Sequence, residues 1–356
     1  MAQSETDSVL VNTVMRIFSE LSTPDVINRA EEGEPQEQLW NVLCETAIPW
    51  AWVQEDYGGA GFSVVDCAPV LRLAGKYAVP APLCETLISG WLLARTGCEV
   101  PVTSLTMAPV NHAGSVALTP DGRLNGVVYQ VPYAAEVEQI IVIVPCDNEF
   151  AIVSVPKMDA QLSNGRNLAG EPLNDIRFNE LDVNVIRKCK YPGLIEALLR
   201  VGAQVRSLQM AGALERILEM TVEYAQERKQ FDRPIAGFQA VQHNVAVLAE
   251  EAAAAQCAAE NGLMQWVRFG IDDSRTEFAI AAAKIRCGEA AARGTKIAHQ
   301  VHGAMGFARE YPLHQFTRRL WSWCDDFGST SDWASKLGYL VCREGSTELW
   351  PTITAI

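Results

Sequence analysis

Basic residues are scarce in this sequence of 356 residues. Lysine and arginine together number 29, against 43 aspartate and glutamate residues, so the formal net charge is −14. A surface that binds nucleic acid or an anionic membrane usually carries the opposite balance. The composition therefore argues against both as the main partner, while local basic sites stay open.

Long apolar runs and closely paired cysteines are also absent. No stretch approaches the roughly 18 apolar residues of a membrane helix, and residues 1–30 lack the basic and apolar regions of a signal peptide. The ten cysteines include no C-x-x-C pair, and the histidines show no metal-ligand spacing. We therefore expect a cytoplasmic chain with reduced thiols, no membrane span and no metal.

Apolar residues make up 49% of the sequence, and their spacing and type change twice along the chain. Helical spacing over residues 1–100 predicts an N-terminal helical domain. Residues 101–192 are β-branched and turn-rich, which predicts a small barrel-like β-domain of about six strands. Helical spacing returns over residues 193–356 and predicts a C-terminal four-helix bundle. The expected fold class is α+β.

Individual elements can be predicted within these parts. Asp121-Gly122 and Asn125-Gly126 are turn signals beside alternating apolar residues. The runs at 139–144 and 150–155 predict a strand pair, and residues 176–183 predict a further strand. Three long helices are predicted at the C-terminal end. They cover residues 194–230, 238–268 and 274–303.

Two clusters in the last third are dense in particular residue types. In YAQERKQFDRPIAGFQAVQH (224–243), Arg228 stands at a predicted helix junction, where a surface ion pair is the ordinary expectation. In residues 300–330, Gly303 and Gly306 suit either a helix C-cap or a close approach of backbone to a ligand. Gln300 and His302 precede this turn and add hydrogen-bonding groups, although a single His is more often structural.

Together these stretches resemble the acyl-CoA dehydrogenase flavoprotein family. The match runs in order through EDYGGAGFSVVD (55–66), the β-region at 124–183, the R-x-Q-F-x-x-P-I-x-x-F-Q-A-V-Q-H stretch and Q-x-H-G-x-x-G-F-x-x-E-Y-P (300–312). It covers nearly the whole chain. The resemblance implies the same helical, β and helical organisation that the residue periodicity predicts.

The resemblance also implies FAD as cofactor. In such enzymes the arginine corresponding to Arg228 pairs with the flavin pyrophosphate of a neighbouring subunit, a contact that suits a guanidinium. Phe231 and Gln239 would line the adenosine end of FAD. Gln300, Gly303 and Gly306 would form the turn that lies against the same ADP portion. One FAD shared across an interface implies an oligomer.

The family's catalytic carboxylate is missing from both of its usual positions. Alignment of the Q-x-H-G-x-x-G-F stretch without a gap places Phe327 where the family has its catalytic glutamate. In some members the base stands on the preceding long helix, at a position that corresponds to about Gly202. Asp325 or Asp326 is an alternative base if the loop shifts by one residue. Two adjacent acids can equally be a solvated turn or a helix N-cap.

The segments that hold the flavin ring in the family also match poorly. They correspond here to residues 105–118 and 129–139, where Tyr133 can stack, hydrogen-bond or simply pack. A chain that keeps the ADP contacts but lacks the base and ring contacts is expected in a hetero-oligomer. The leading hypothesis is one of two different subunits of a heterotetrameric acyl-CoA dehydrogenase of the bacterial steroid side-chain type.

Two alternatives remain. One is a self-sufficient dehydrogenase or oxidase-like enzyme, in a homo-oligomer instead of a heterotetramer, that uses Asp326 as base. The other is a scaffold of the same fold that binds no flavin. Either enzyme reading implies an acyl-CoA substrate and an electron-transfer acceptor, and the sequence names neither.

Overall fold

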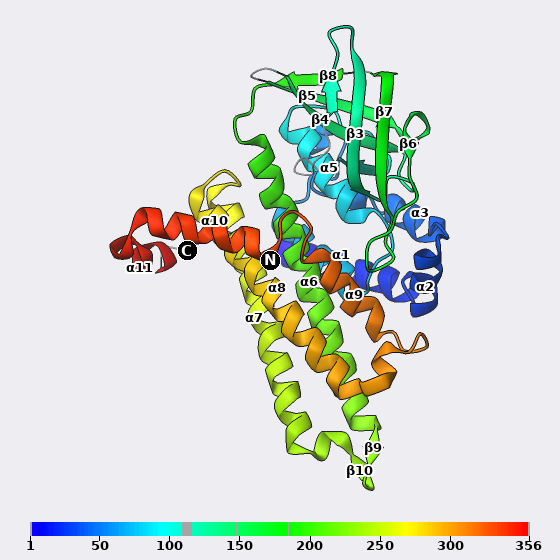
Figure 1. Cartoon of the computed structure of the whole chain (residues 1–356), viewed down its shortest axis with the longest axis vertical. Helices are drawn as coiled ribbons and strands as arrows, with labels where there is room; N and C mark the ends of the chain where they lie inside the picture. The colour runs from blue at the N-terminus through cyan, green and yellow to red at the C-terminus, as the bar shows by residue number, and fades with distance from the viewer. Residues whose placement is uncertain (1, 109–115, 147–148, 184, 355–356) are drawn as a thin grey trace. The chain divides into compact units, whose positions relative to one another are not determined.

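A computed structural model of the chain describes residues 2–108, 116–146, 149–183 and 185–354 (Figure 1). The chain forms two compact units that interleave along the sequence. One unit contains residues 1–27, 64–79 and 199–356, and the other contains residues 28–63 and 80–198. Residues 1–100 thus contribute to both units. The division into three domains with boundaries at 100 and 192 stays a prediction.

The first unit is helical, and α6 is its central element. Residues 201–214 of α6 are buried without interruption, which is the burial expected of a helix surrounded by others. Glycines allow α4 and α6 to touch through their backbones, because a Cβ on Gly75 would collide with Gln209 and one on Gly212 would collide with Arg72. The helices of this unit are α1 (Ala2–Leu21), α4 (Val64–Lys76), α6 (Leu194–Glu227), α7 (Gln239–Phe269), α8 (Ser274–His302), α9 (Leu313–Trp323), α10 (Thr330–Glu344) and α11 (Ser346–Thr354).

The predicted C-terminal helices are confirmed almost residue by residue. The predicted spans 194–230, 238–268 and 274–303 correspond to α6, α7 and α8. Local signals explain the ends: Asp273 caps α8 by accepting a hydrogen bond from the backbone of Arg275, and Gly270 ends α7 with φ +84°. The cap and the glycine therefore define the residues at which α7 ends and α8 begins.

The second unit contains most of α2 (Pro24–Glu32), then α3 (Glu37–Glu45), α5 (Leu83–Arg95) and the described β-strands of residues 105–189. Two four-stranded sheets, in the orders β1-β4-β5-β8 and β2-β3-β7-β6, share one apolar core. The strands are β1 (Leu105–Met107), β2 (Val116–Leu118), β3 (Arg123–Pro132), β4 (Gln139–Cys146), β5 (Glu149–Pro156), β6 (Gln161–Leu162), β7 (Leu173–Asp182) and β8 (Val185–Cys189). The predicted α+β class is confirmed.

The strand predictions succeed except at one turn signal. β4 and β5 pair antiparallel, as the two apolar runs predict, and the strand predicted at 176–183 is the C-terminal part of β7. Asp121-Gly122 does form the turn between β2 and β3. Asn125-Gly126, however, lies inside β3, so its interpretation as a turn is wrong. Its asparagine instead accepts a hydrogen bond from the backbone of Glu180 on the neighbouring strand.

The described helices do not include one that is both long and apolar enough to span a membrane. All ten cysteines lie within the described residues, and each is a free thiol.

Candidate functional site

A tight hairpin follows the end of α6 and carries the first group of predicted site residues. The strands β9 (Lys229–Gln230) and β10 (Arg233–Pro234) pair antiparallel, and Phe231 and Asp232 form the two-residue turn between them. Both turn residues have positive φ, +52° and +62°, which is the backbone of a type I′ hairpin. The hairpin therefore has a defined shape at the end of the helical unit.

Arg228 stands at the base of this hairpin with its backbone fixed and its side chain free. Its N–H donates to the carbonyl of Tyr224, and its carbonyl accepts from Ile235 at 2.8 Å. The guanidinium is exposed and has no hydrogen bond or ion pair within the part of the chain that the structure describes. The ordinary expectation of a surface ion pair at Arg228 is therefore not met, and its charge is available to an external anion.

Phe231 and Gln239 are presented beside it. The Phe231 side chain is 86% exposed and contacts Phe238 edge to face, with ring centroids 6.1 Å apart. The guanidinium of Arg233 lies 4.1 Å above the ring of Phe238. Gln239 is the first residue of α7 and is exposed. The hairpin thus offers a cation, an apolar ring and an amide to a partner molecule.

The second group lies at the end of α8, where the chain turns into the short 3₁₀ helix η5 (Gly303–Phe307). Gly303 has φ +59° and ψ −137°, a conformation that side-chain-bearing residues rarely adopt, and it is exposed. Gly306 is buried for a different reason: a Cβ there would lie 3.0 Å from Nδ1 of His299 and 3.0 Å from a methyl group of Leu313. One glycine is required by backbone conformation and the other by close packing.

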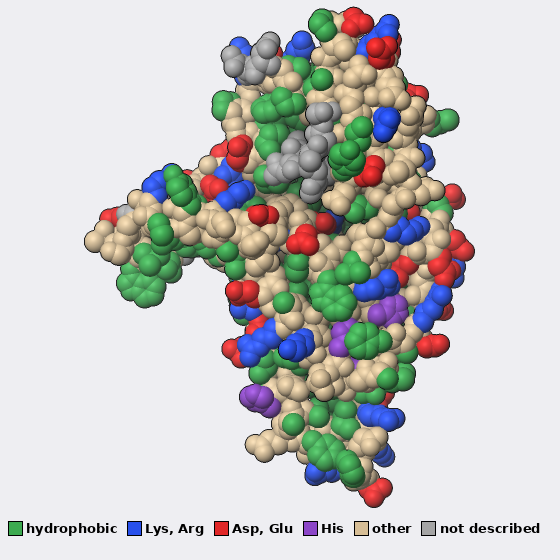
Figure 2. All heavy atoms as spheres, in the orientation of Figure 1, with side chains coloured by type: hydrophobic (Ala, Val, Ile, Leu, Met, Phe, Trp, Pro, Cys, Tyr) green, Lys and Arg blue, Asp and Glu red, His purple; other side chains and the backbone are tan. Residues whose placement is uncertain are grey.

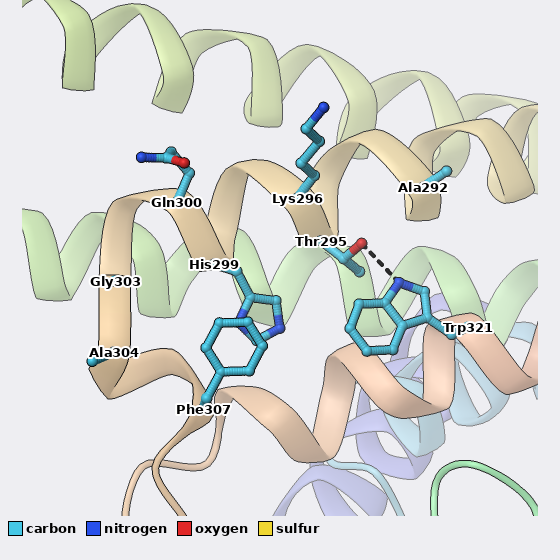
Figure 3. Close-up of a pocket in the computed structure, with 9 residues that line it drawn as sticks. All are labelled: Ala292, Thr295, Lys296, His299, Gln300, Gly303, Ala304, Phe307 and Trp321. Carbon is cyan, nitrogen blue, oxygen red and sulfur yellow. Dashed lines mark hydrogen bonds between the residues drawn. The ribbon is translucent and has the colours of Figure 1, made fainter.

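A groove of about 560 Å³ opens beside this turn (Figure 3). The imidazole of His299 stacks on Phe307 with centroids 4.1 Å apart, and Trp321 donates a hydrogen bond from Nε1 to Thr295 at 3.0 Å. Lys296 and Gln300 extend from the opposite side of α8 in Figure 3. The groove is lined by Ala292, Thr295, Lys296, His299, Gln300, Gly303, Ala304, Phe307 and Trp321. The lining combines aromatic rings with an amide and an ammonium group, which suit a ligand with planar and anionic parts.

The two histidines at this end of α8 differ: His299 lines the groove, and His302 supports the fold. Burial lowers the pKa of both His299 and His302, which favours the neutral imidazole at each position. His302 shares hydrogen bonds with the carbonyl of Ala298 at 2.8 Å and with the hydroxyl of Tyr311 at 3.1 Å. Its ring also stacks on Tyr224, near the end of α6. His302 therefore stabilises the turn through contacts with neighbouring residues, and it is buried instead of facing a ligand.

The structure places the predicted cofactor contacts in two groups, one at the hairpin and one at the glycine turn, and it places Asp326 in neither group. Gln300 and Gly303 line the groove, Gly306 lies buried under the turn, and the hairpin residues are not among the groove lining. Lys296, Phe307 and Trp321 line the groove but were not predicted from the sequence as site residues. Phe307 was within reach of sequence reasoning, because it belongs to the same G-F motif as Gly306.

Asp326, the predicted alternative base, lies in the loop between α9 and α10 and is held by an arginine. Its Oδ2 accepts a hydrogen bond from Nε of Arg206 at 2.8 Å, and the Arg206 side chain is 6% exposed. The N-cap of α10 is Ser329, which forms a capping box with Asp332, so Asp326 does not cap that helix. The carboxylate of Asp326 is engaged in an ion pair instead of projecting freely.

Tyr133, the candidate ring contact of the β-region, is a core residue. It is 5% exposed, has φ +53° and belongs to the apolar cluster between the two sheets. The packing alternative therefore describes Tyr133. Half of the other candidate ring segment (105–118), namely residues 109–115, lies outside the described residues.

Charged side chains of both signs are mixed over the face of the molecule drawn in Figure 2. Arg228 and Lys296 are exposed cations in a chain whose net charge is −14. An anionic ligand would therefore meet individual donors instead of a broad positive field.

Comparison with known proteins finds similarity to acyl-CoA dehydrogenases. Residues 193–322 match the family described as "Acyl-CoA dehydrogenase, C-terminal domain", a span that contains the hairpin, α8, the turn and the groove. Over 324 residues the chain is 27% identical to "Acyl-CoA dehydrogenase IpdE2" of Mycobacterium tuberculosis, covering 90% of this chain and 92% of that protein.

Solved structures agree on the fold. The chain is similar to one in the crystal structure of the ChsE4-ChsE5 complex from Mycobacterium tuberculosis, with a TM-score of 0.84, 23% identity and coverage of 94% and 96% of the two chains. It is equally similar to one in the structure of the Tcur3481-Tcur3483 steroid ACAD G363A variant, with a TM-score of 0.84, 21% identity and coverage of 96% and 99%. These likenesses extend over both compact units.

Proposed function

We propose that this chain is a subunit of an FAD-dependent enzyme that desaturates an acyl-CoA thioester between Cα and Cβ, on the basis of its similarity to acyl-CoA dehydrogenases. The proposed role of the subunit is to supply contacts to the ADP part of FAD. The observation that carries this proposal is the free guanidinium of Arg228 on a well-defined hairpin.

The residues present fit an ADP group. Arg228 offers charge-assisted hydrogen bonds to the pyrophosphate, and the exposed ring of Phe231 offers an apolar surface to the adenosine. Gln239 and Gln300 offer amides, and Gly303 leaves open space where a Cβ would stand. Gly306 lets the turn pack tightly on His299 and keeps that backbone in place. FAD, when bound, supplies the acceptor for the hydride that leaves Cβ.

Desaturation also needs a carboxylate to remove the Cα proton, and this chain offers none at the two usual positions. Phe327 and Gly202 occupy them. We therefore propose that a homologous partner subunit supplies the base and that the two subunits form a heterotetramer. The names of two structural neighbours each join two proteins, and one of those structures is described as a steroid ACAD, which supports a CoA thioester of a steroid as the substrate class.

The alternative of a self-sufficient enzyme assigns the base to Asp326. The ion pair with buried Arg206 speaks against this alternative, because it holds the Asp326 carboxylate at α6 instead of leaving it to reorient toward a substrate. The alternative of a flavin-free scaffold explains neither of two features. It gives no role to the unpaired Arg228, and it gives no reason for a glycine at exposed position 303, whose backbone conformation other residues rarely adopt. Location in the cytoplasm and an electron-transfer acceptor remain part of the proposal.

The test is the visible absorption spectrum of the purified chain, alone and co-expressed with homologues encoded near its gene. The proposal expects little flavin on the chain alone, and a flavin-loaded complex with desaturase activity on acyl-CoA after co-expression. Tightly bound flavin with full activity on the chain alone would contradict the subunit role. Failure of every co-expressed homologue to give a flavin-loaded complex would favour the scaffold.

A further inference from the structure

The loop from Cys324 to Ser329 places the ring of Phe327 directly on α6. A Cβ built on Gly202 would collide with three ring atoms of Phe327, Cγ, Cδ1 and Cε1. The two positions therefore share one volume, which the aromatic ring fills. No side chain of any kind can stand at residue 202 while Phe327 holds this conformation.

Arg206 ties the same loop to α6 one helical turn further along. Its Nε donates to Asp326 at 2.8 Å, and its Nη1 donates to Gln209 at 2.6 Å. Its guanidinium carbon lies 5.7 Å from the ring centroid of Trp323 and 6.0 Å from that of Phe327. A buried arginine with this set of contacts fixes the position of the residue next to Phe327.

Two further donors hold the loop backbone. Nζ of Lys284, a residue 1% exposed, donates to the carbonyls of Trp323 and Cys324 at 2.9 and 2.7 Å, where α9 ends. Nε1 of Trp333 donates to the carbonyl of Phe327 at 3.0 Å. Phe327 itself has φ +56°, which is rare for a bulky side chain and persists only when its surroundings determine it.

From these contacts we propose that the Phe327 ring is held in place as a plug, that is, a side chain that fills the volume beside Gly202. Arg206 is the positioning residue, and we call its hydrogen bonds to Asp326 and Gln209 the lock. The plug fills the volume into which a carboxylate from either usual position would project. In this chain the space for a catalytic carboxylate is therefore filled, in addition to the carboxylate itself being absent. The inference rests on the proposed function for the meaning of that volume, but the lock and the plug are testable without flavin.

The lock is tested by alkylation of Cys324 in the full-length chain. The Cys324 thiol is mostly buried, and burial raises its pKa to about 11, so iodoacetamide reacts with it slowly while the loop is closed. Arg206→Met is expected to speed alkylation of Cys324, read by peptide mass spectrometry, on the order of tenfold or more. Arg206→Lys should restore part of the protection.

Arg200→Met is the matched control, because Arg200 is also a buried arginine of α6 and pairs with Glu277 at 3.2 Å, away from the loop. It should leave Cys324 alkylation near the wild-type rate. Asp326→Asn, which weakens the same ion pair from the loop side, serves if Arg206→Met does not fold. Equal Cys324 alkylation rates in wild type, Arg206→Met and Asp326→Asn would overturn the lock.

The plug is tested by a double-mutant cycle on the melting temperature. Gly202→Ala should lower the melting temperature by about 5 °C or more in the wild-type background, because the new methyl group displaces the Phe327 ring. In the Phe327→Ala background the same substitution should cost little. An equal cost of Gly202→Ala in both backgrounds would overturn the plug. Because neither readout needs flavin, failure of the proposed function would show separately, as a flavin-free complex with an intact plug.

Discussion

The phenol ring of Tyr224 stacks on the imidazole of His302, with ring centroids 4.5 Å apart and an interplanar angle of 27°. Tyr224 lies four residues before Arg228, and its carbonyl accepts the Arg228 N–H. His302 directly precedes Gly303. This contact therefore joins the segment before the hairpin to the segment before the glycine turn. The hairpin and the turn are the two places that we assign to the ADP part of FAD.

Replacement of Tyr224 tests this connection. Tyr224→Leu keeps an apolar side chain but removes the ring stacking, which should cost about 1 kcal/mol of unfolding free energy. Flavin occupancy of the complex should fall as well, because the hairpin and the turn lose their common support. Urea denaturation and the flavin to protein absorbance ratio measure the two effects. Tyr339→Leu, at a tyrosine that is 69% exposed, is the control, and equal effects of both variants would contradict the connection.

Alanine at either glycine of the turn should lower stability, for a different reason at each position. Gly306→Ala brings a methyl group 3.0 Å from His299 Nδ1 and from Leu313, so it should lower the stability of the folded chain by about 1–3 kcal/mol through overpacking. Gly303→Ala meets no neighbouring atom, and its cost of about 1–3 kcal/mol comes from the backbone conformation alone. Flavin titration of each variant complex should show weaker binding. Unchanged stability of both variants would contradict the described turn.

Asp326→Asn separates the structural role of this carboxylate from a catalytic one. Loss of the negative charge leaves Arg206 with a weaker partner, so the unfolding free energy should fall by about 1–2 kcal/mol, since the Asp326 side chain is 33% exposed. Turnover of the flavin-loaded complex, measured below the melting temperature, should change less than about threefold. A loss of turnover of a hundredfold or more would instead support Asp326 as the base.

Glu136 makes the stability of the β-region depend on pH. Burial raises its pKa from the ordinary value of 4.5 to about 7, against the opposing attraction of Arg166 and Lys157. The unfolded chain therefore loses this proton at lower pH than the folded chain, and stability is lost as the pH rises from about 4.5 to about 7. Glu136→Gln removes the loss.

The Gln variant should therefore be more stable than wild type at pH 8, by up to about 3 kcal/mol, and the difference should shrink toward pH 5. Urea midpoints measured at several pH values give the comparison. Glu99→Gln, at an exposed glutamate of the same unit, is the control. A Glu136→Gln difference that stays constant across this pH range would contradict the raised pKa.

The long helices were predictable because their signals are local and repeated. Spacing of apolar residues over some thirty positions predicts α6, α7 and α8, and alternation predicts β4 and β5. Asn125-Gly126 was misinterpreted because a strong turn dipeptide can be overridden by pairing on both sides. β3 is bonded to β2 and β7 there, and the side chain of Asn125 serves the neighbouring strand.

The site was predictable only where a motif lies in one continuous stretch. Arg228 and Gly303 belong to such stretches, but the wall made by Trp321 and His299 depends on α8 and α9 lying together. The contact between Gly202 and Phe327 joins residues 125 positions apart and follows from the path of the loop. Sequence comparison identified both as the missing base positions, yet it carried no signal that one ring fills the space of both.

The flavin content of the complex with Arg228→Ala is the most direct test of the central claim, that this chain holds the ADP part of a shared FAD. The guanidinium is replaced by a methyl group at an exposed position, so folding should be preserved and the melting temperature of the apo complex nearly unchanged. Loss of a charged hydrogen bond costs about 1.5–3 kcal/mol, which is about ten- to hundredfold in FAD affinity. Arg228→Lys should recover part of it. An FAD affinity of the Arg228→Ala complex equal to that of wild type would contradict the account.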